Sequence, residues 1–258
     1  MLLFDRLVMT DPERSVEMAR ELAASLVPTA EPVVPEHVLP EHVRPELQVA
    51  WISLPADEVG GDFYDRLPGP DGAVYAVIGD VSGAGPLTAL FMTMTTCLFR
   101  ILAQDALPPG AMLAQANRIL HPHLARRRML ITAQIACYRP ATRALALASA
   151  GHLWPYFMTK EGARELAFEG VPLGTLADTE YPERSHDVTP GDRLVMYTDG
   201  IVECTDGSGE MFGFERLAGA LAGDTAAALV AALIERFTRF IGEAPRRDDV
   251  SVVALAWS

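Results

Sequence analysis

Four aspartates in separated segments are the residues of this chain most suited to chemistry. They are Asp62 in VGGDFYD, Asp80 in VIGDVSGAG, Asp199 in YTDGIVE and Asp248 in RRDDVSV. In three of these segments the aspartate ends or adjoins an apolar, strand-like run, so strand ends and tight turns should present the carboxylates to one cleft. Converging carboxylates repel and raise each other's pKa, and hard divalent cations relieve that repulsion. The pattern predicts a Mg²⁺- or Mn²⁺-dependent hydrolytic site.

The composition is that of an acidic chain with a large apolar content. Of the 258 residues, 50% are hydrophobic, which is enough for a core between two packed layers. The formal net charge of −13 argues against nucleic acid as the main partner. Cys97, Cys137 and Cys204 lie far apart without a CxxC pair, so neither a disulfide framework nor a zinc site is expected. A reducing, cytoplasmic location is the simplest interpretation.

The longest uncharged stretch, Val81 to Phe99, raises the question of a membrane span. It contains Gly83, Gly85 and Pro86 near its start, followed by several threonines. That composition is poor for a helix in lipid, so we expect a buried helix preceded by a turn. The N-terminal residues include acids and arginine and lack the pattern of a signal peptide. We therefore expect no membrane partner.

Residues 1–45 differ in kind from the rest of the chain. Asp11-Pro12-Glu13 is typical of a helix start, and the helix is expected to run to about Val27. Five prolines then exclude a helix or a central strand; they are Pro28, Pro32, Pro35, Pro40 and Pro45. We expect a helix and a Pro-rich linker that either brace the surface or form a regulatory segment, with residues 46–258 as the main domain.

From Glu46 onward, strands alternate with longer helices. The expected strands are Leu47–Ser53, Ala73–Gly79, Met129–Tyr138, Ala144–Ser149, Leu153–Met158, Arg193–Thr198 and Val250–Trp257. The expected helices are Pro86–Gln104, Pro109–Leu124, Phe214–Ala222 and Thr225–Ile241. Short connections such as Pro140-Ala141-Thr142 favour antiparallel pairing, and Leu229, Leu233 and Phe237 form an apolar helical stripe. The pattern predicts an α+β fold of two packed antiparallel sheets flanked by helices.

Taken in order, several segments resemble the metal-dependent protein phosphatase family (PPM, or phosphatase 2C-like), in its bacterial SpoIIE/RsbU-type branch. They are VGGDFYD, IGDVSGAG, AGHLWPYF, the PLG of Pro172–Gly174, GDRLVMYTDGIVE, GEMFGFERL and DDVSVV. Each is weak alone, but the ordered set covers roughly residues 47–257. The resemblance implies an αββα sandwich and hydrolysis of phosphoserine or phosphothreonine by a water that bridges two Mn or Mg ions.

The resemblance also implies roles for particular residues. Asp80 is expected to bind both metals, with the carbonyl of Val81 helping one of them. Asp62 is expected to bind the second metal, while Asp199 and Asp248 complete the first metal site from the opposite sheet. Four glycines are expected to shape the backbone around the ions and the following turn: Gly79, Gly200, Gly83 and Gly85.

Other residues are weaker candidates for metal ligation or catalysis. Asp65 and Asp249 are expected mainly as turn or cap residues, with metal ligation left open. Ser82 stands where the eukaryotic branch has a histidine, so the general acid is unassigned, and Ala84 removes a substrate contact that relatives make. His152 is expected to make a structural hydrogen bond. His121 and His123 are expected at the surface, as is the run Arg126-Arg127-Arg128; no phosphate-gripping arginine is evident.

The leading hypothesis is a cytoplasmic bacterial protein serine/threonine phosphatase. The resemblance implies a phosphorylated anti-sigma-factor antagonist as substrate, in a partner-switching pathway that regulates a sigma factor. Two alternatives are a phosphatase-fold binding module with little turnover and a hydrolase of small phosphate esters. The N-terminal helix is expected either to form a homodimer or to dock an activator or sensor protein.

Overall fold

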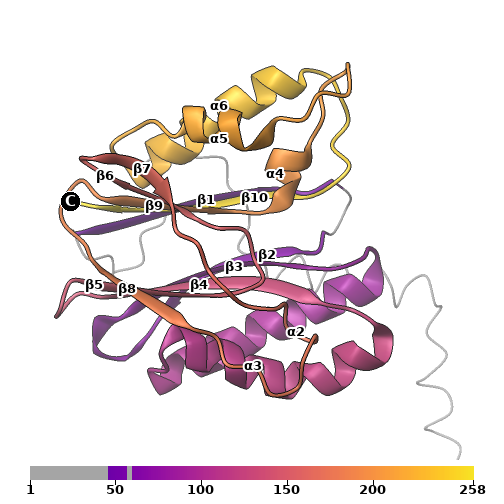
Figure 1. The fold of residues 1–258 in the computed structure, drawn as a ribbon, viewed down its shortest axis with the longest axis vertical. Helices are drawn as coiled ribbons and strands as arrows, with labels where there is room; N and C mark the ends of the chain where they lie inside the picture. The colour runs from indigo at the N-terminus through magenta and orange to yellow at the C-terminus, as the bar shows by residue number, and fades with distance from the viewer. Residues whose placement is uncertain (1–45, 57–59) are drawn as a thin grey trace, which may run out of the picture.

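The computed structural model describes residues 46–56 and 60–258. Two antiparallel five-stranded sheets stack face to face, and helices cover their outer faces (Figure 1). This arrangement is the expected αββα sandwich of the α+β class. The expected helix and linker of residues 1–45 lie outside the described residues, so the boundary at residue 46 stays a prediction.

Sheet A contains both described ends of the chain. Its strands are, in spatial order, β1 (Leu47–Leu54), β10 (Val250–Trp257), β9 (Arg193–Tyr197), β6 (Tyr156–Thr159) and β7 (Gly162–Glu165). The register pairs Leu47 with Trp257 and Leu54 with Val250. All eight residues of β10 are buried, as befits a strand between two neighbours and two layers.

Sheet B is formed mainly by the first half of the domain. Its strands are, in spatial order, β2 (Asp62–Pro68), β3 (Val74–Val81), β4 (Ile131–Arg139), β5 (Ala144–Ala150) and β8 (Glu183–Asp187). The short turn between β4 and β5 gives the expected antiparallel pair. Because β2, β3 and β4 are neighbours, residues at one end of the three strands are brought together.

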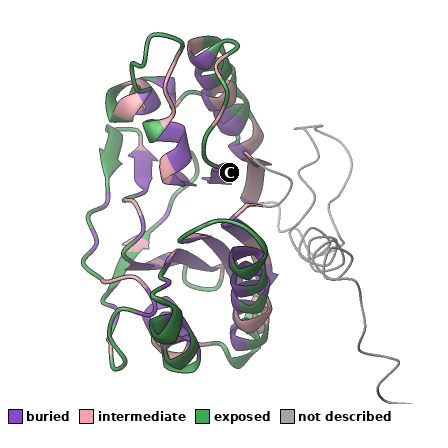
Figure 2. Cartoon of the chain, turned by 90° about the vertical axis from the view of Figure 1, so that its right-hand side faces the viewer, coloured by how far each residue is buried: buried purple, intermediate pink, exposed green. Residues whose placement is uncertain are grey.

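The helices divide between the two outer faces. On sheet B lie α2 (Pro86–Leu102) and α3 (Pro109–Leu124), followed by the 3₁₀ turns η2 (Ala103–Asp105) and η3 (Ala125–Arg127); η1 (Pro70–Gly72) joins β2 to β3. On sheet A lie α5 (Gly213–Ala220) and α6 (Ala226–Ile241), while the short α4 (Asp199–Glu203) follows β9. The helices are exposed on their outward sides and buried toward the sheets (Figure 2).

Three apolar clusters fill the spaces between these layers. One lies between sheet B and α2–α3, one between sheet A and α5–α6, and one between the sheets. The predicted stripe of Leu229, Leu233 and Phe237 is buried in the second cluster. Leu47 belongs to the cluster between the sheets, with Val49 and Trp51 packed against it, so the predicted face of β1 is confirmed.

The uncharged stretch that raised the membrane question forms β3's last residue, a turn and most of α2. Among the described residues, Pro86–Asp105 is the one helical segment with the length and composition of a membrane span, and 56% of its most apolar window is buried. Phe91, Met92 and Phe99 pack in the cluster beneath sheet B. The segment is therefore a core helix of this fold, as expected.

Sequence patterns missed three strands, and all three lie at sheet edges. These are β2, β7 and β8. All residues of β7 are exposed, and β8 is nearly so, which removes the apolar alternation that identifies a strand. Edge strands of natural proteins are commonly short and charged because this discourages pairing with other chains. The same composition hides β7 and β8 from pattern analysis.

Candidate metal centre

The acidic centre begins with a pair of aspartates on neighbouring strands of sheet B. Asp62 starts β2, Asp80 lies near the end of β3, and the register places them directly opposite each other. Side chains alternate along a strand, so Asp62 shares a face with Tyr64, and Asp80 shares one with Ile78. Tyr64 and Ile78 pack between the two sheets. The pair therefore faces the inter-sheet space at its end.

The other two predicted aspartates come from sheet A. Asp199 is the first residue of α4, directly after β9, and Asp248 lies two residues before β10. Because β9 and β10 are paired neighbours, Asp199 and Asp248 lie at the same end of sheet A. Four segments that are far apart in sequence thus meet at one end of the sandwich.

Burial and mutual repulsion raise the pKa values of these carboxylates. Burial, followed by the charges of Asp199, Asp248 and Asp249, raises the pKa of Asp80 to about 7. Burial and then the charge of Asp80 raise the pKa of Asp62 well above its ordinary value. Burial also raises the pKa of Asp199 and of Asp248. Carboxylates in this arrangement favour protonation or the presence of a cation.

A glycine lets two of the expected ligand oxygens lie close to the backbone. A Cβ atom added at Gly61 would lie 2.9 Å from Asp80 Oδ1 and 2.7 Å from the backbone oxygen of Val81. The side-chain oxygen and the carbonyl oxygen therefore both border one small volume. The oxygen atoms predicted to serve one ion are thus close together.

A threonine that sequence reasoning did not single out orients Asp62. Thr198 Oγ1 donates a hydrogen bond to Asp62 Oδ2 at 2.8 Å and accepts one from the backbone N–H of Ser251 at 2.9 Å. Because that hydroxyl proton is directed at Asp62, one carboxylate oxygen is fixed by sheet A. The signal in the sequence was the TDG motif itself, whose threonine precedes Asp199.

Asp249 holds the backbone of the centre together. Its Oδ1 accepts a hydrogen bond from Ala56 N at 2.8 Å, and its Oδ2 accepts one from Gly61 N at 2.7 Å. The side chain is 6% exposed, and a Cβ at Gly60 would lie 1.7 Å from Asp249 Oδ2. The carboxylate therefore ties Ala56 and Gly61 to the residue before β10.

Asp65 lies outside the acidic centre. It is three residues beyond Asp62 along β2, so its side chain points to the opposite face of the strand. There its Oδ2 accepts a hydrogen bond at 2.6 Å from Nε of Arg100, a residue of α2. This ion pair joins the first helix to the edge strand. It leaves Asp65 on the helix side of sheet B.

Ser82 is engaged in the backbone of sheet B. Its N–H donates to Leu130 O at 2.9 Å, and its Oγ accepts from Leu130 N at 2.8 Å. These contacts extend the β3–β4 pairing beyond Val81. The hydroxyl of Ser82 therefore serves as a structural acceptor.

The glycines around the centre permit close backbone packing. A Cβ at Gly200 would lie 2.0 Å from the backbone oxygen of Asp249, and one at Gly79 would lie 2.4 Å from that of Thr132. These two positions are thus crowded by neighbouring backbone. Gly83 and Gly85 have φ of +105° and +86°, the left-handed backbone expected for the turn into α2.

His152 links the two sheets. Its Nε2 lies 3.1 Å from the backbone oxygen of Tyr197 in sheet A, and its Nδ1 lies 2.9 Å from Oγ1 of Thr132 in sheet B. A carbonyl only accepts, so Nε2 carries the proton and Nδ1 accepts from the threonine. Burial lowers the pKa of His152 to about 4. The imidazole is therefore neutral and structural, as predicted.

The chain matches the family model of Stage II sporulation protein E (SpoIIE) over residues 70–258. It belongs to the SpoIIE family. The resemblance to the SpoIIE/RsbU-type branch of the metal-dependent phosphatases is thereby confirmed, and the matched region includes three of the four aspartates, from Asp80 onward.

Individual relatives of this SpoIIE-family chain are distant. The chain is 28% identical to phosphoserine phosphatase RsbU of Bacillus subtilis over 165 residues, which cover 63% of this chain and 49% of RsbU. It thus spans about half the length of that relative. The SiaA-PP2C domain of Pseudomonas aeruginosa has a TM-score of 0.74 at 23% identity, with 100% of both chains covered. RsbX, solved in complex with magnesium, has a TM-score of 0.63 at 14% identity, covering 84% of this chain and 98% of RsbX. These two structures support the fold.

The donor set of this SpoIIE-family domain fits hard divalent cations. Within 46–56 and 60–258, no three carboxylate, imidazole or thiol groups are arranged as a complete ion-binding cluster. Mg²⁺ does not need one, because it keeps several waters and binds through one or two carboxylates. The centre offers only oxygen donors, and burial followed by mutual repulsion raises the pKa of Asp62 and Asp80. Both features suit Mg²⁺ or Mn²⁺.

Proposed function

We propose that this domain is a metal-dependent protein serine/threonine phosphatase. The observation that supports it best is the convergence of Asp62 and Asp80 from sheet B with Asp199 and Asp248 from sheet A. Burial, followed by the charges of Asp199 and Asp248, raises the pKa of Asp80 to about 7. Membership of the SpoIIE family and similarity to the phosphoserine phosphatase RsbU point to the same activity.

The proposed metal ligands are those expected from the motifs. Asp80 would contact both ions, and the carbonyl of Val81 would assist at one of them. Asp62 would serve the second ion, and Asp199 with Asp248 would complete the first site. When bound, two Mn²⁺ or Mg²⁺ ions supply positive charge for phosphoryl oxygens and lower the pKa of water.

Residues of the chain hold the groups of the acidic centre in fixed positions. Thr198 fixes one oxygen of Asp62, and Asp249 fixes the loop that carries Gly61 next to Asp80. Such preorganisation means that little rearrangement is needed when charge develops on the phosphate. Ser82 Oγ accepts a backbone hydrogen bond and is a weak acid, so protonation of the leaving alkoxide falls to water rather than to this side chain.

The proposed substrate is a phosphorylated anti-sigma-factor antagonist in a partner-switching pathway. The support is the family and the similarity to RsbU, which covers about half of that protein. Dephosphorylation would let the antagonist capture its anti-sigma partner. This role places the protein in the bacterial cytoplasm, in keeping with three free cysteines at Cys97, Cys137 and Cys204.

Substrate comparison tests this proposal against its two alternatives. Phosphate release would be measured with Mn²⁺ on a phosphoserine peptide, on nucleotides and on sugar phosphates. A phosphoprotein phosphatase is expected to hydrolyse the peptide with the higher kcat/KM. Preference for the small esters would support a small-molecule hydrolase, and binding of the peptide without turnover would support a regulatory binding module.

Residues 1–45 are proposed as a regulatory segment, either through homodimerisation or through an activator or sensor protein that docks on it. The apolar spacing of the expected helix, followed by a Pro-rich linker, supports this. A variant lacking residues 1–28 would be compared with the full chain for activity and for mass in solution. Unchanged activity and unchanged mass would contradict the proposal.

A further inference from the structure

A hollow of about 560 Å³ lies mainly on the outer side of sheet A, and Gly151 and His152 also line it. Its walls come from the turn before β6, from the β6–β7 hairpin, from the end of β9 and from α5. The lining residues that matter for its chemistry are Trp154, Tyr156, Glu165, Tyr197, Phe214 and Glu215. Four of them are aromatic and two are acidic.

The hollow is separate from the acidic centre but close to it. Thr198 faces the inter-sheet space, where it contacts Asp62. Tyr197, one residue earlier, has its side chain on the other side of the sheet, in the cluster beneath α5 and α6. Since consecutive Cα atoms are about 3.8 Å apart, the Cα atoms of Tyr197 and Asp199 are at most about 7.6 Å apart. A ligand in the hollow would therefore sit beside the centre on the other side of sheet A.

Aromatic surfaces dominate the walls of the hollow. Tyr156 and Tyr197 are buried and stack with ring centroids 6.1 Å apart. Trp154 and Phe214 are 45% and 49% exposed. Trp154 is held in place because its Nε1 donates to the backbone oxygen of Phe168 at 3.1 Å. Exposed aromatic rings that border a hollow mark a binding surface, and their faces attract cations.

Two exposed carboxylates add negative charge to this aromatic surface. Glu165 lies opposite Tyr156 in the β6–β7 pair, and Glu215 lies in the first turn of α5, next to Phe214. Neither forms an ion pair with any residue in the described part of the chain. The hollow therefore carries two acidic groups that have no arginine or lysine of the described residues within ion-pair distance.

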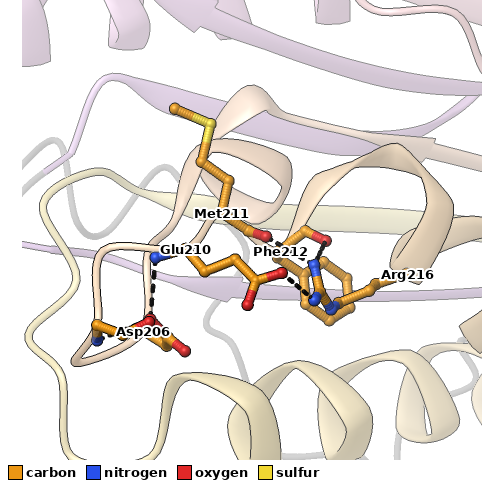
Figure 3. A network of polar contacts seen from close by, with 6 residues as sticks. Asp206, Glu210, Met211, Phe212 and Arg216 are labelled. Atoms are coloured by element: carbon orange, nitrogen blue, oxygen red, sulfur yellow. Dashed lines mark hydrogen bonds and ion pairs between the residues drawn. The ribbon is translucent and has the colours of Figure 1, made fainter.

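The arginine of α5, Arg216, has its interaction partners outside the hollow (Figure 3). Arg216 pairs with Glu210 and donates from Nη1 to the backbone oxygens of Met211 and Phe212 at 2.9 and 3.3 Å. Its guanidinium also lies 4.7 Å from the ring centroid of Phe240. These contacts fix the start of α5, which carries Phe214 and Glu215, and keep the positive charge of Arg216 engaged with the preceding loop.

We propose that this hollow binds an arginine side chain of the phosphoprotein substrate. A guanidinium group stacks on aromatic faces and pairs with carboxylates through planar donors, which Trp154, Phe214, Glu165 and Glu215 supply together. A lysine side chain would fit the same surface less well. The net charge of −13 also favours a basic partner segment. The inference rests on the proposed function, since it assigns the group to the substrate of the adjacent centre.

Binding by itself is tested without any turnover. N-acetyl-arginine amide would be titrated into the full chain while tryptophan fluorescence is followed. The variant Trp154→Phe would identify the part of the signal that comes from Trp154. N-acetyl-citrulline amide would serve as the neutral probe. The arginine probe is expected to saturate, and Glu165→Gln with Glu215→Gln should weaken it about tenfold, the sum of a few modest charge contacts. Glu161→Gln, on the same hairpin but outside the hollow, should leave it unchanged. Equal binding of citrulline, or an unaffected double variant, would overturn the proposal.

A second measurement separates a substrate side chain from a free small cation. Phosphoserine peptides would carry one arginine or one citrulline at successive positions on either side of the phosphoserine. At one position, the arginine peptide is expected to have a KM about tenfold lower than the citrulline peptide, with the same kcat. The double variant should abolish this difference in KM. Turnover of p-nitrophenyl phosphate should be unaffected by the double variant, which shows that the centre itself is intact. Binding of the free probe with no gain at any peptide position would overturn the assignment to the substrate.

Discussion

Asp62 and Asp80 lie directly opposite each other on the antiparallel strands β2 and β3. Like charges at such positions destabilise a sheet, and here both side chains are also withdrawn from water, which raises the pKa of each. The pair thus lowers the stability of the metal-free domain at neutral pH. A divalent cation would remove that repulsion, so the feature that weakens the fold is the one that suits it to metal binding.

Replacing Asp80 should therefore stabilise the metal-free protein. Asp80→Asn removes a buried charge that Asp199 and Asp248 oppose, and we expect a gain of about 1–2 kcal/mol in the free energy of unfolding at pH 8. Urea unfolding in EDTA would measure it, with Asp187→Asn on the exposed strand β8 as control. A loss of stability in Asp80→Asn would show that the carboxylate is already compensated.

The stability of the metal-free protein should also depend on pH through Asp80. Its folded pKa is raised to about 7 from an ordinary 3.8, so between these values the folded state holds a proton that the unfolded state has released. The free energy of unfolding should then fall as pH rises from about 5 to 7, by at most about 1.4 kcal/mol per pH unit for this group. The difference in the free energy of unfolding between wild type and Asp80→Asn, measured in EDTA at each pH, isolates the contribution of Asp80. A difference that does not change with pH would contradict it.

Asp249 and Asp248 are adjacent but should respond differently to substitution. Asp249→Ala deprives the backbone N–H groups of Ala56 and Gly61 of their acceptor, and we expect a loss of about 2–4 kcal/mol. Asp248→Asn keeps an acceptor for Asp249 N, so its metal-free stability should change by less than about 1 kcal/mol while Mn²⁺ affinity falls. Urea unfolding and calorimetric Mn²⁺ titration would distinguish them. Equal destabilisation of the two variants would refute the division of roles.

His152 should make the fold sensitive to acid. Its folded pKa is lowered to about 4 from an ordinary 6.5, so the unfolded state binds a proton first as pH falls. The stability that the neutral imidazole contributes is complete above about pH 6.5 and is lost progressively toward pH 4. His152→Gln should lower stability at pH 7 by about 1–3 kcal/mol and flatten this acid dependence. An acid limb that is unchanged in His152→Gln would exclude this histidine as its source.

The sequence predicted the parts of the fold whose patterns are set by burial. The helix Pro109–Leu124 was predicted with its observed bounds because Pro108 and Pro109 mark its start and its apolar face is regular. The edge strand β7 has no buried residue, so no alternation revealed it. The four aspartates came from ordered motifs that tie each to a strand end. The role of Thr198 depends on contacts with Asp62 and Ser251, and pairings over such sequence distances are not visible in local patterns.

Metal-dependent turnover is tested by phosphate release from a phosphoserine peptide during Mn²⁺ titration, with wild type and Asp80→Asn measured side by side. We expect turnover by wild type that rises and saturates with Mn²⁺, and a loss of at least about a hundredfold in Asp80→Asn because the charge that would hold both ions is removed. Circular dichroism would verify that the variant is folded. Equal, metal-independent turnover by both proteins would contradict the account, as would no turnover by folded wild type at saturating Mn²⁺.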